Sequence, residues 1–184
     1  MVDNHIISNC IKGKRKAHSV LYSSCIPYAY SIVSRYLPNS EDRKDVIQEA
    51  FVKVFRSIQK YDAGKGTFNL WLRKIVVNEC LMFIRKNKRL PLLTSVEEVP
   101  EFQLSEEVKH NQLTKRDIEN ALSDMPEGYK IVFMLNVIDG YNHGEISKML
   151  NIKKETSRSQ LARAKKWMQK NLIDNRKNIA YGIF

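Results

Sequence analysis

Cysteine and histidine are scarce in this chain of 184 residues. The three cysteines are odd in number, widely spaced and set among apolar residues at helical spacing. We therefore expect reduced thiols in the core at Cys10, Cys25 and Cys80, because unpaired cysteine packs as a small apolar side chain. The four histidines lie at no ligand-like spacing from cysteines or acids, so we expect neither a metal site nor a cofactor.

Long apolar runs are missing from the sequence. No stretch approaches the roughly 18 consecutive apolar residues of a membrane-spanning helix. The N-terminal stretch Met1 to Ser8 resembles no signal peptide, and basic residues follow from Lys12, so we expect a cytoplasmic protein. The alternation of apolar and polar residues that is typical of strands is missing too, and the expected fold class is all-α.

Acidic residues are outnumbered, with 20 Asp and Glu against 31 Lys and Arg, and the formal net charge is +11. This balance favours a polyanionic partner, either nucleic acid or an acidic membrane surface. Residues 1–90 hold 17 basic and 7 acidic residues, residues 91–112 one basic and five acidic, and residues 113–184 13 basic and 8 acidic. We expect two small helical domains, 1–90 and 113–184, joined by a flexible acidic linker, 91–112.

Apolar residues recur at steps of three and four along both domains, which predicts helices. Ser40 and Thr67 are the predicted N-caps of two helices in the first domain, because their hydroxyl groups can accept backbone hydrogen bonds. Pro27 falls inside an earlier helical pattern and is expected to kink it. The helices are expected over the ranges 20–36, 40–58, 67–89, 114–123 and 126–140.

The segment from Asn142 to Met168 has the pattern of a helix-turn-helix. A short helix is followed by a tight connection at residues 151–153 and by a second helix from about Lys154. In such units the second helix lies in the major groove of DNA. Its outward face is expected to offer Arg158 and Gln160, which can read guanine and adenine, each for about 1–3 kcal/mol of discrimination. The alternative is an exposed basic helix that contacts no DNA.

The stretch YDAGKGTFNLWL, residues 61–72, contains a Gly-Lys-Gly-Thr sequence beside a helix start. A phosphate-binding loop needs a first glycine five positions before Gly64 and a Ser or Thr directly after its lysine. Gln59 and Gly66 occupy those positions, and no strand precedes the loop. Nucleotide hydrolysis is therefore not expected, and the loop needs another explanation.

Three segments in order resemble one protein family. Residues 42–55, DRKDVIQEAFVKVF, resemble the polymerase-binding helix of bacterial sigma factors, and residues 61–78 resemble the promoter-melting segment that follows it. Residues 121–166 are similar to their C-terminal helix-turn-helix. No segment looks like the extra middle domain of larger sigma factors. The chain thus resembles the small, two-domain extracytoplasmic-function (ECF) class of the sigma-70 family.

The resemblance implies a subunit of transcription initiation rather than an enzyme. Such a protein binds the clamp and flap regions of core RNA polymerase, reads the −35 duplex and captures a melted −10 base. The other implied partners are promoter DNA and an anti-sigma factor, possibly membrane-linked, with no small-molecule substrate. The alternative function is a stand-alone helix-turn-helix transcriptional regulator, which would bind its DNA site without polymerase.

The resemblance also assigns roles to particular residues. Contact with core polymerase is implied for Asp45, Gln48, Glu49, Phe51, Val54 and Phe55, although the spacing of the last three favours core packing over contact with a partner. Capture of the −10 base and contact with the melted strand are implied for Lys65, Thr67, Phe68, Asn69, Arg73, Lys74, Asn78, Arg85 and Lys86. Reading of the −35 element is implied for His143, Thr156, Arg158, Ser159, Gln160, Arg163 and Lys166.

Overall fold

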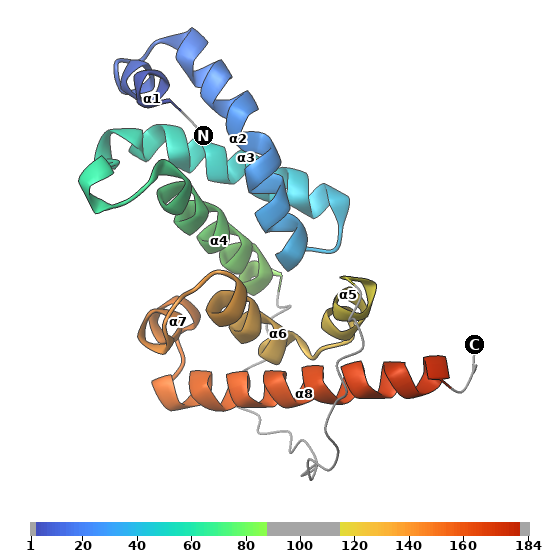
Figure 1. Ribbon diagram of the computed structural model, residues 1–184. Helices are drawn as coiled ribbons and strands as arrows, with labels where there is room; N and C mark the ends of the chain where they lie inside the picture. The colour runs from blue at the N-terminus through green and yellow to red at the C-terminus, as the bar shows by residue number, and fades with distance from the viewer. Residues whose placement is uncertain (1–2, 88–114, 181–184) are drawn as a thin grey trace. The chain divides into compact units, whose positions relative to one another are not determined.

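The computed structural model describes residues 3–87 and 115–180, and side chains over residues 3–87 and 116–172 (Figure 1). The chain divides into two compact units, Met1–Lys88 and Arg89–Phe184. Regular structure in the described residues is helical, without strands, and this confirms the all-α fold class. The predicted acidic linker, 91–112, lies outside the described residues.

The first unit is built on three long helices. α2 (Arg15–Tyr36), α3 (Ser40–Ser57) and α4 (Phe68–Lys86) pack against one another in pairs, and the short α1 (Asn4–Ile11) packs on α2 (Figure 1). Two 3₁₀ turns, η1 (Ile58–Lys60) and η2 (Ala63–Lys65), connect α3 to α4. The core between the helices is apolar and includes the fully buried side chains of Leu21, Ile32, Val54, Leu72 and Val76.

Side-chain caps set two of the helix starts. Thr67 caps α4 as predicted, because its hydroxyl oxygen accepts a hydrogen bond from the backbone N–H of Leu70 at 3.3 Å. The cap of α3 is Asn39 rather than the predicted Ser40, and its side-chain oxygen accepts from the N–H of Glu41 at 2.7 Å. Either residue type can cap a helix, so the sequence prediction was wrong by one position.

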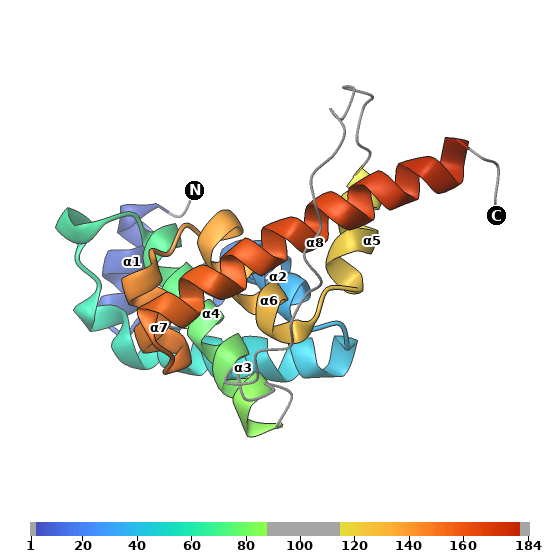
Figure 2. The same cartoon turned by 90° about the horizontal axis from the view of Figure 1, so that it is seen from below.

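The second unit is organised around one long helix. α8 (Lys154–Ala180) contacts α5 (Lys115–Ser123), α6 (Glu127–Phe133) and α7 (His143–Leu150). A π-helical segment, η3 (Met134–Ile138), continues α6. Figures 1 and 2 both show α5, α6 and α7 along α8, with α7 near the start of α8 and α5 further along it.

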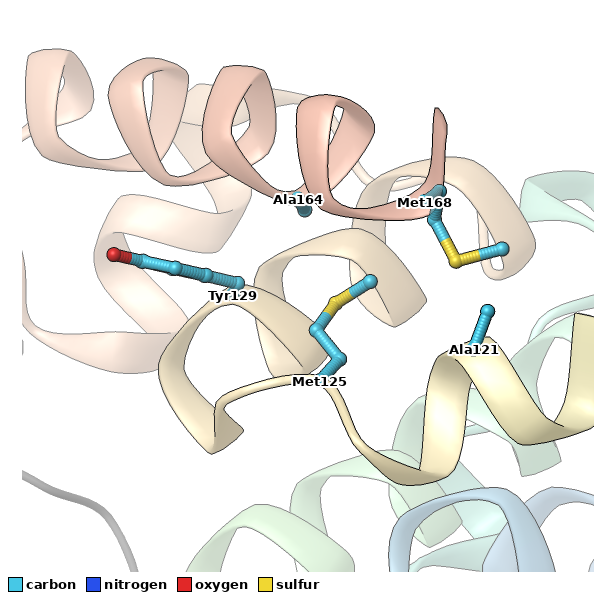
Figure 3. Close-up of a cluster of buried hydrophobic side chains, with 5 residues drawn as sticks. All are labelled: Ala121, Met125, Tyr129, Ala164 and Met168. Atoms are coloured by element: carbon cyan, nitrogen blue, oxygen red, sulfur yellow. The ribbon is translucent and has the colours of Figure 1, made fainter. Parts of the chain in front are cut away.

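An apolar cluster fixes the far end of this arrangement. It joins α5, α6 and the middle of α8, and its buried members are Ala121, Met125, Tyr129, Ala164 and Met168 (Figure 3). Trp167 packs against the cluster, and its indole Nε1 donates a hydrogen bond to the backbone oxygen of Ala121 at 3.2 Å. The cluster packs the middle of α8 against α5 and α6 and leaves the opposite face of the helix exposed.

Two further features concern the burial of the cysteines and the length of the apolar helices. All three cysteines are buried and none forms a disulfide, in agreement with the expected core thiols. Burial raises the pKa of the Cys25 thiol to about 11, so this thiol stays protonated at neutral pH. Among the helices of the described ranges, none is long and apolar enough to cross a membrane.

Candidate polymerase and nucleic-acid interfaces

The connection between α7 and α8 has the geometry of a helix-turn-helix. Asn142 and Glu145 form a capping box at the start of α7, in which the side chain of each bonds the backbone N–H of the other. Asn151 ends α7 in the left-handed conformation, with φ of 54°. Asparagine tolerates this conformation better than most residues, so the chain can turn here directly into α8.

His143 ties the two helices of this motif together. Its ring nitrogen Nδ1 lies 2.9 Å from the hydroxyl oxygen of Ser157, which is fully buried in α8. Burial, followed by the positive charges of Arg158, Lys154 and Lys165, lowers the pKa of His143 below its ordinary value. His143 is therefore a neutral bracing residue at pH 7, held in the positive field of α8.

The outward face of α8 carries most of the predicted −35 set. Arg158, Ser159 and Lys166 are exposed, while Arg163 and Thr156 are half-buried at its edges. At about 100° per residue, Ser159 and Lys166 lie near the middle of this face and the two arginines lie on its flanks. The exposed cations Lys154 and Lys165 add to the same surface. This face has the composition of a surface that contacts both phosphates and base edges.

Gln160 corrects the prediction for this face. It is only 3% exposed, so it cannot reach a base edge in this conformation. Three consecutive helical residues span about 200°, and the buried stripe through Ser157, Leu161 and Ala164 takes up Gln160. Its side-chain oxygen has no hydrogen-bond partner among the described residues. Gln160 was predicted to face outward because it is polar, but it packs inside the motif, so that prediction was wrong.

The glycine-rich loop between α3 and α4 is folded rather than open. Asp62 starts η2, and its carboxylate accepts from the N–H of Gly64 at 2.9 Å and lies 3.7 Å from the Nζ of Lys65. Gly66 has φ of 142°, which a residue with a β-carbon rarely adopts. The hydroxyl of Tyr61 donates to the Gly66 oxygen at 3.2 Å and closes the loop. We call residues 61–67 the melting loop, after the promoter-melting segment that they resemble in sequence.

Three aromatic rings pack together where the two ends of this loop meet. Tyr61, Phe68 and Trp71 contact one another with ring centroids 5.3 to 5.7 Å apart. Phe68 is buried, 5% exposed, so the structure corrects its predicted role as a base contact and makes it a support of the loop. Tyr61 and Trp71 are half-buried and keep part of their rings accessible. Sequence reasoning missed Tyr61, although its spacing to Phe68 and Trp71 was visible.

Only some of the residues predicted to contact the melted strand lie on the exposed face of α4. Lys74, Asn78 and Arg85 follow one another along a single exposed stripe that begins near the melting loop. Asn69 and Arg73 are half-buried on the other flank, and Asn69 lies about 180° around the helix from Asn78. The structure therefore brings three of the polar residues together and separates two others from them. Thr67 and Lys86, also predicted, are exposed at the two ends of α4.

The exposed face of α3 is acidic and polar. Asp45, Gln48 and Glu49 are exposed on one stripe, and none has a hydrogen-bond or ion-pair partner within the described residues. Val52 continues the stripe at 41% exposure, a residue that sequence reasoning missed although it lies one turn after Glu49. Unpaired carboxylates beside an apolar side chain suit a basic protein surface.

The aromatic residues of α3 belong to the core. Phe51 is 3% exposed and packs edge-on against Tyr22 at 4.7 Å, and Val54 is fully buried. Phe55 is half-buried against the ring of His18 at 4.9 Å. A buried Phe51 cannot contact a partner directly, so its predicted role in polymerase binding is corrected to one of positioning the exposed stripe.

An ion pair fixes α3 against α4. The Nζ of Lys53 lies 2.6 Å from a carboxylate oxygen of Glu79, whose side chain is 9% exposed. This contact joins the helix with the acidic stripe to the helix with Lys74 and Asn78, which belong to the same unit. No group of three potential metal ligands gathers anywhere in the described parts of the chain.

Comparison with known families places both units. The model of sigma-70 region 2 matches residues 21–90, and the model of sigma-70 region 4 matches residues 115–168. The ECF RNA polymerase sigma-E factor of Escherichia coli (strain K12) is 30% identical over 96% of this chain and 94% of its own length. The chain belongs to the ECF family of RNA polymerase sigma factors. The resemblance inferred from sequence is thereby confirmed.

Other relatives of this sigma factor agree with the assignment. The ECF sigma factor SigE of Mycolicibacterium smegmatis is 31% identical over 76% of this chain, and the match spans 55% of SigE. Two solved structures share the fold. CnrH, in complex with the cytosolic domain of CnrY, is 18% identical with a TM-score of 0.52, and covers 94% of this chain and 97% of its own. The sigma factor RpoE of Bartonella quintana, in complex with the anti-sigma factor NepR, is 17% identical with a TM-score of 0.53, covering 84% and 95%.

Proposed function

We propose that this sigma factor binds core RNA polymerase and directs initiation at promoters that it reads with both units. The exposed face of α8 reads the −35 duplex, and the melting loop with the α4 stripe captures a melted −10 base. The observation that carries the proposal is the presence of an amide, Asn78, between the cations Lys74 and Arg85 on the exposed stripe of α4, the helix that follows the loop. An amide can read a base edge, and the cations can hold the phosphates of the same strand.

The acidic stripe of α3 is the proposed polymerase-binding surface. Asp45, Gln48 and Glu49 bind the clamp of core polymerase, and Val52 adds an apolar contact at the end of that surface. The ion pair between Lys53 and Glu79 links this docked helix to α4. Docking on polymerase thus aligns the melting loop with the DNA strand that polymerase holds. The second unit is proposed to contact the flap while α8 lies on the −35 duplex.

An anti-sigma factor is the proposed regulator. RpoE, which shares this fold, was solved with such a partner. The partner, possibly anchored to a membrane, would cover the acidic stripe or the face of α8 and so block polymerase or DNA. Release of the regulator would expose the covered surface again.

Two single substitutions test whether α8 reads the −35 element and α3 binds polymerase. Arg158→Ala should relax discrimination at one −35 position by about 10–100-fold while sparing core binding, because it removes a base contact of about 1–3 kcal/mol. Glu49→Ala should weaken core binding several-fold and leave −35 preference unchanged. Lys170→Ala, which removes an exposed cation further along α8, is the matched control. Equal effects of Arg158→Ala and Glu49→Ala on naked DNA would instead favour a regulator that binds DNA without polymerase.

A further inference from the structure

The first unit carries a second basic surface outside the melting loop and the α4 stripe. Lys12, Lys14, Arg15 and Lys16 follow one another at the junction of α1 and α2, and all four are exposed. We call these four residues the basic turn. The sequence contains no acidic residue between Asp3 and Glu41, so no neighbouring carboxylate along the chain offsets this charge.

The basic turn is held in place by the backbone. Gly13 has φ of 74°, and its N–H donates to the oxygen of Cys10 at 2.9 Å, while the N–H of Lys14 donates to Asn9 at 3.1 Å. From the first turns of α2, the ring nitrogen Nε2 of His18 lies 3.1 Å from the same Cys10 oxygen. The four cations therefore project from a fixed corner and not from a loose tail.

A role in stabilising the helix does not explain the basic turn. α2 begins at Arg15, its first turn contains no acidic residue, and Lys14 provides no side-chain cap. Cations at the N-terminal end of a helix oppose the helix dipole, and like charges so close in sequence repel one another. The arrangement lowers the stability of α2, and an anion at this corner would relieve the repulsion.

The position of the corner indicates which anion it meets. The ring of His18 packs on Phe55 in the last turns of α3, and α1 contacts η1, which leads directly into the melting loop (Figure 1). The basic turn therefore lies at the same end of the unit as the loop. Arg56 and Lys60 are exposed at this end too, while the carboxylate of Asp62 is already beside Lys65.

We propose that the basic turn binds the phosphate backbone of promoter DNA next to the base held by the melting loop. This inference rests on the proposed function of the loop and adds a DNA contact that is independent of sequence. Lysine and arginine on phosphates release condensed counterions, which gives affinity and a steep salt dependence without reading any base. The contact would hold the strand while the melting loop selects its base.

An acidic membrane surface is the competing partner. Ile11 is 40% exposed and Val20 is 48% exposed on either side of the basic turn, and apolar residues beside cations also suit anionic lipid. DNA is the favoured partner because the corner lies at the end of the unit that carries the melting loop.

The test compares a neutralised variant with a charge-preserving one. The first combines Lys12→Gln, Lys14→Gln, Arg15→Gln and Lys16→Gln, and the second combines Lys12→Arg, Lys14→Arg, Arg15→Lys and Lys16→Arg. Each is assembled with core polymerase and titrated, at several salt concentrations, with a promoter fragment whose −10 region is single-stranded. Urea unfolding, core binding and binding of the chain to phosphatidylserine vesicles are measured in parallel.

The neutralised variant should bind the fragment about tenfold more weakly at about 0.1 M salt, and the slope of log K against log salt should fall by about 2–3. The charge-preserving variant should bind within about twofold of the wild type, and core binding and folding should be retained in both. An unchanged slope in the neutralised variant, or an equal defect in the charge-preserving one, would overturn the inference. So would loss of vesicle binding with DNA binding intact. A wild-type holoenzyme that binds promoter no better than random DNA would overturn the proposed function as well.

Discussion

The two ends of the Lys53–Glu79 ion pair differ in their access to water. The side chain of Lys53 is 42% exposed, whereas that of Glu79 is 9% exposed. Removing the lysine leaves a buried, uncompensated carboxylate, while removing the carboxylate leaves a cation that water can reach. We predict that Lys53→Met lowers the free energy of unfolding by about 3 kcal/mol and Glu79→Gln by about 1 kcal/mol. Urea unfolding followed by Trp71 fluorescence in a Trp167→Phe background measures both, and a larger cost for Glu79→Gln would contradict the argument.

His143 makes stability depend on pH in a defined direction. Its pKa is lowered in the folded state, chiefly by burial, from an ordinary value of 6.5. As pH falls below about 6.5, the unfolded chain takes up a proton at His143 before the folded chain does, so stability is lost in that range. We predict that the stability of wild type relative to His143→Gln falls between pH 7.5 and pH 5.5. Urea unfolding followed by Trp167 fluorescence in a Trp71→Phe background tests this, and a pH-independent difference would contradict it.

Residue types were easier to predict from the sequence than orientations. The cations and amides of the α8 and α4 faces were recognised from composition and spacing, yet Gln160 and Phe68 turned out to be buried. Whether a residue at the edge of an apolar stripe faces the core or the solvent depends on packing between helices, which the sequence does not show. Val52 and Tyr61 were missed for the converse reason, because apolar and aromatic residues are assigned to cores by default.

At the scale of elements, the turn of the helix-turn-helix depends on one left-handed residue. Asn151 has φ of 54°, which glycine adopts without cost and β-branched residues resist. We predict that Asn151→Gly changes the free energy of unfolding by less than about 0.5 kcal/mol and that Asn151→Val lowers it by about 1–2 kcal/mol. Thermal unfolding by circular dichroism compares the two, and equal stability of both variants would show that the turn is not strained.

The melting loop depends on the hydrogen bond that closes it. Tyr61→Phe keeps the ring contacts with Phe68 and Trp71 but removes the donor to the Gly66 oxygen. We predict that this variant loses about 1 kcal/mol of stability or less, and that promoter opening falls by about three- to tenfold because the loop is no longer pre-formed. Permanganate reactivity of unpaired thymines measures opening. Normal opening in a variant that binds core normally would exclude this role.

Helices were predictable as elements, and their exact caps were less so. Periodicity located the long helices of both units, and Thr67 was recognised as a cap from its residue type. Asn39 and Ser40 are both good caps, and only the backbone geometry decides between them. The π-helical segment Met134–Ile138 and the short α1 before residue 12 were not predicted, because neither has a distinct sequence pattern.

At the scale of the whole molecule, the two modules and the family were predicted from the charge distribution and the order of the motifs. Uneven charge indicated two modules, and three motifs in order indicated the ECF sigma family, which the relatives confirm. The acidic stripe of α3 and the basic face of α8 lie in different units, so each can be altered without changing the other. Charge alone could not distinguish polymerase, DNA and membrane as partners, because each attracts a charged surface.

Run-off transcription with purified core polymerase tests the proposed function most directly. Fragments of the source genome that carry candidate promoters are transcribed with core alone, with core plus this chain, and with core plus the Glu49→Ala and Arg158→Ala variants. We predict discrete transcripts that require both core and the chain, reduced overall by Glu49→Ala and redistributed among promoters by Arg158→Ala. The same transcripts from core alone, or no transcript from any fragment with the chain present, would contradict it.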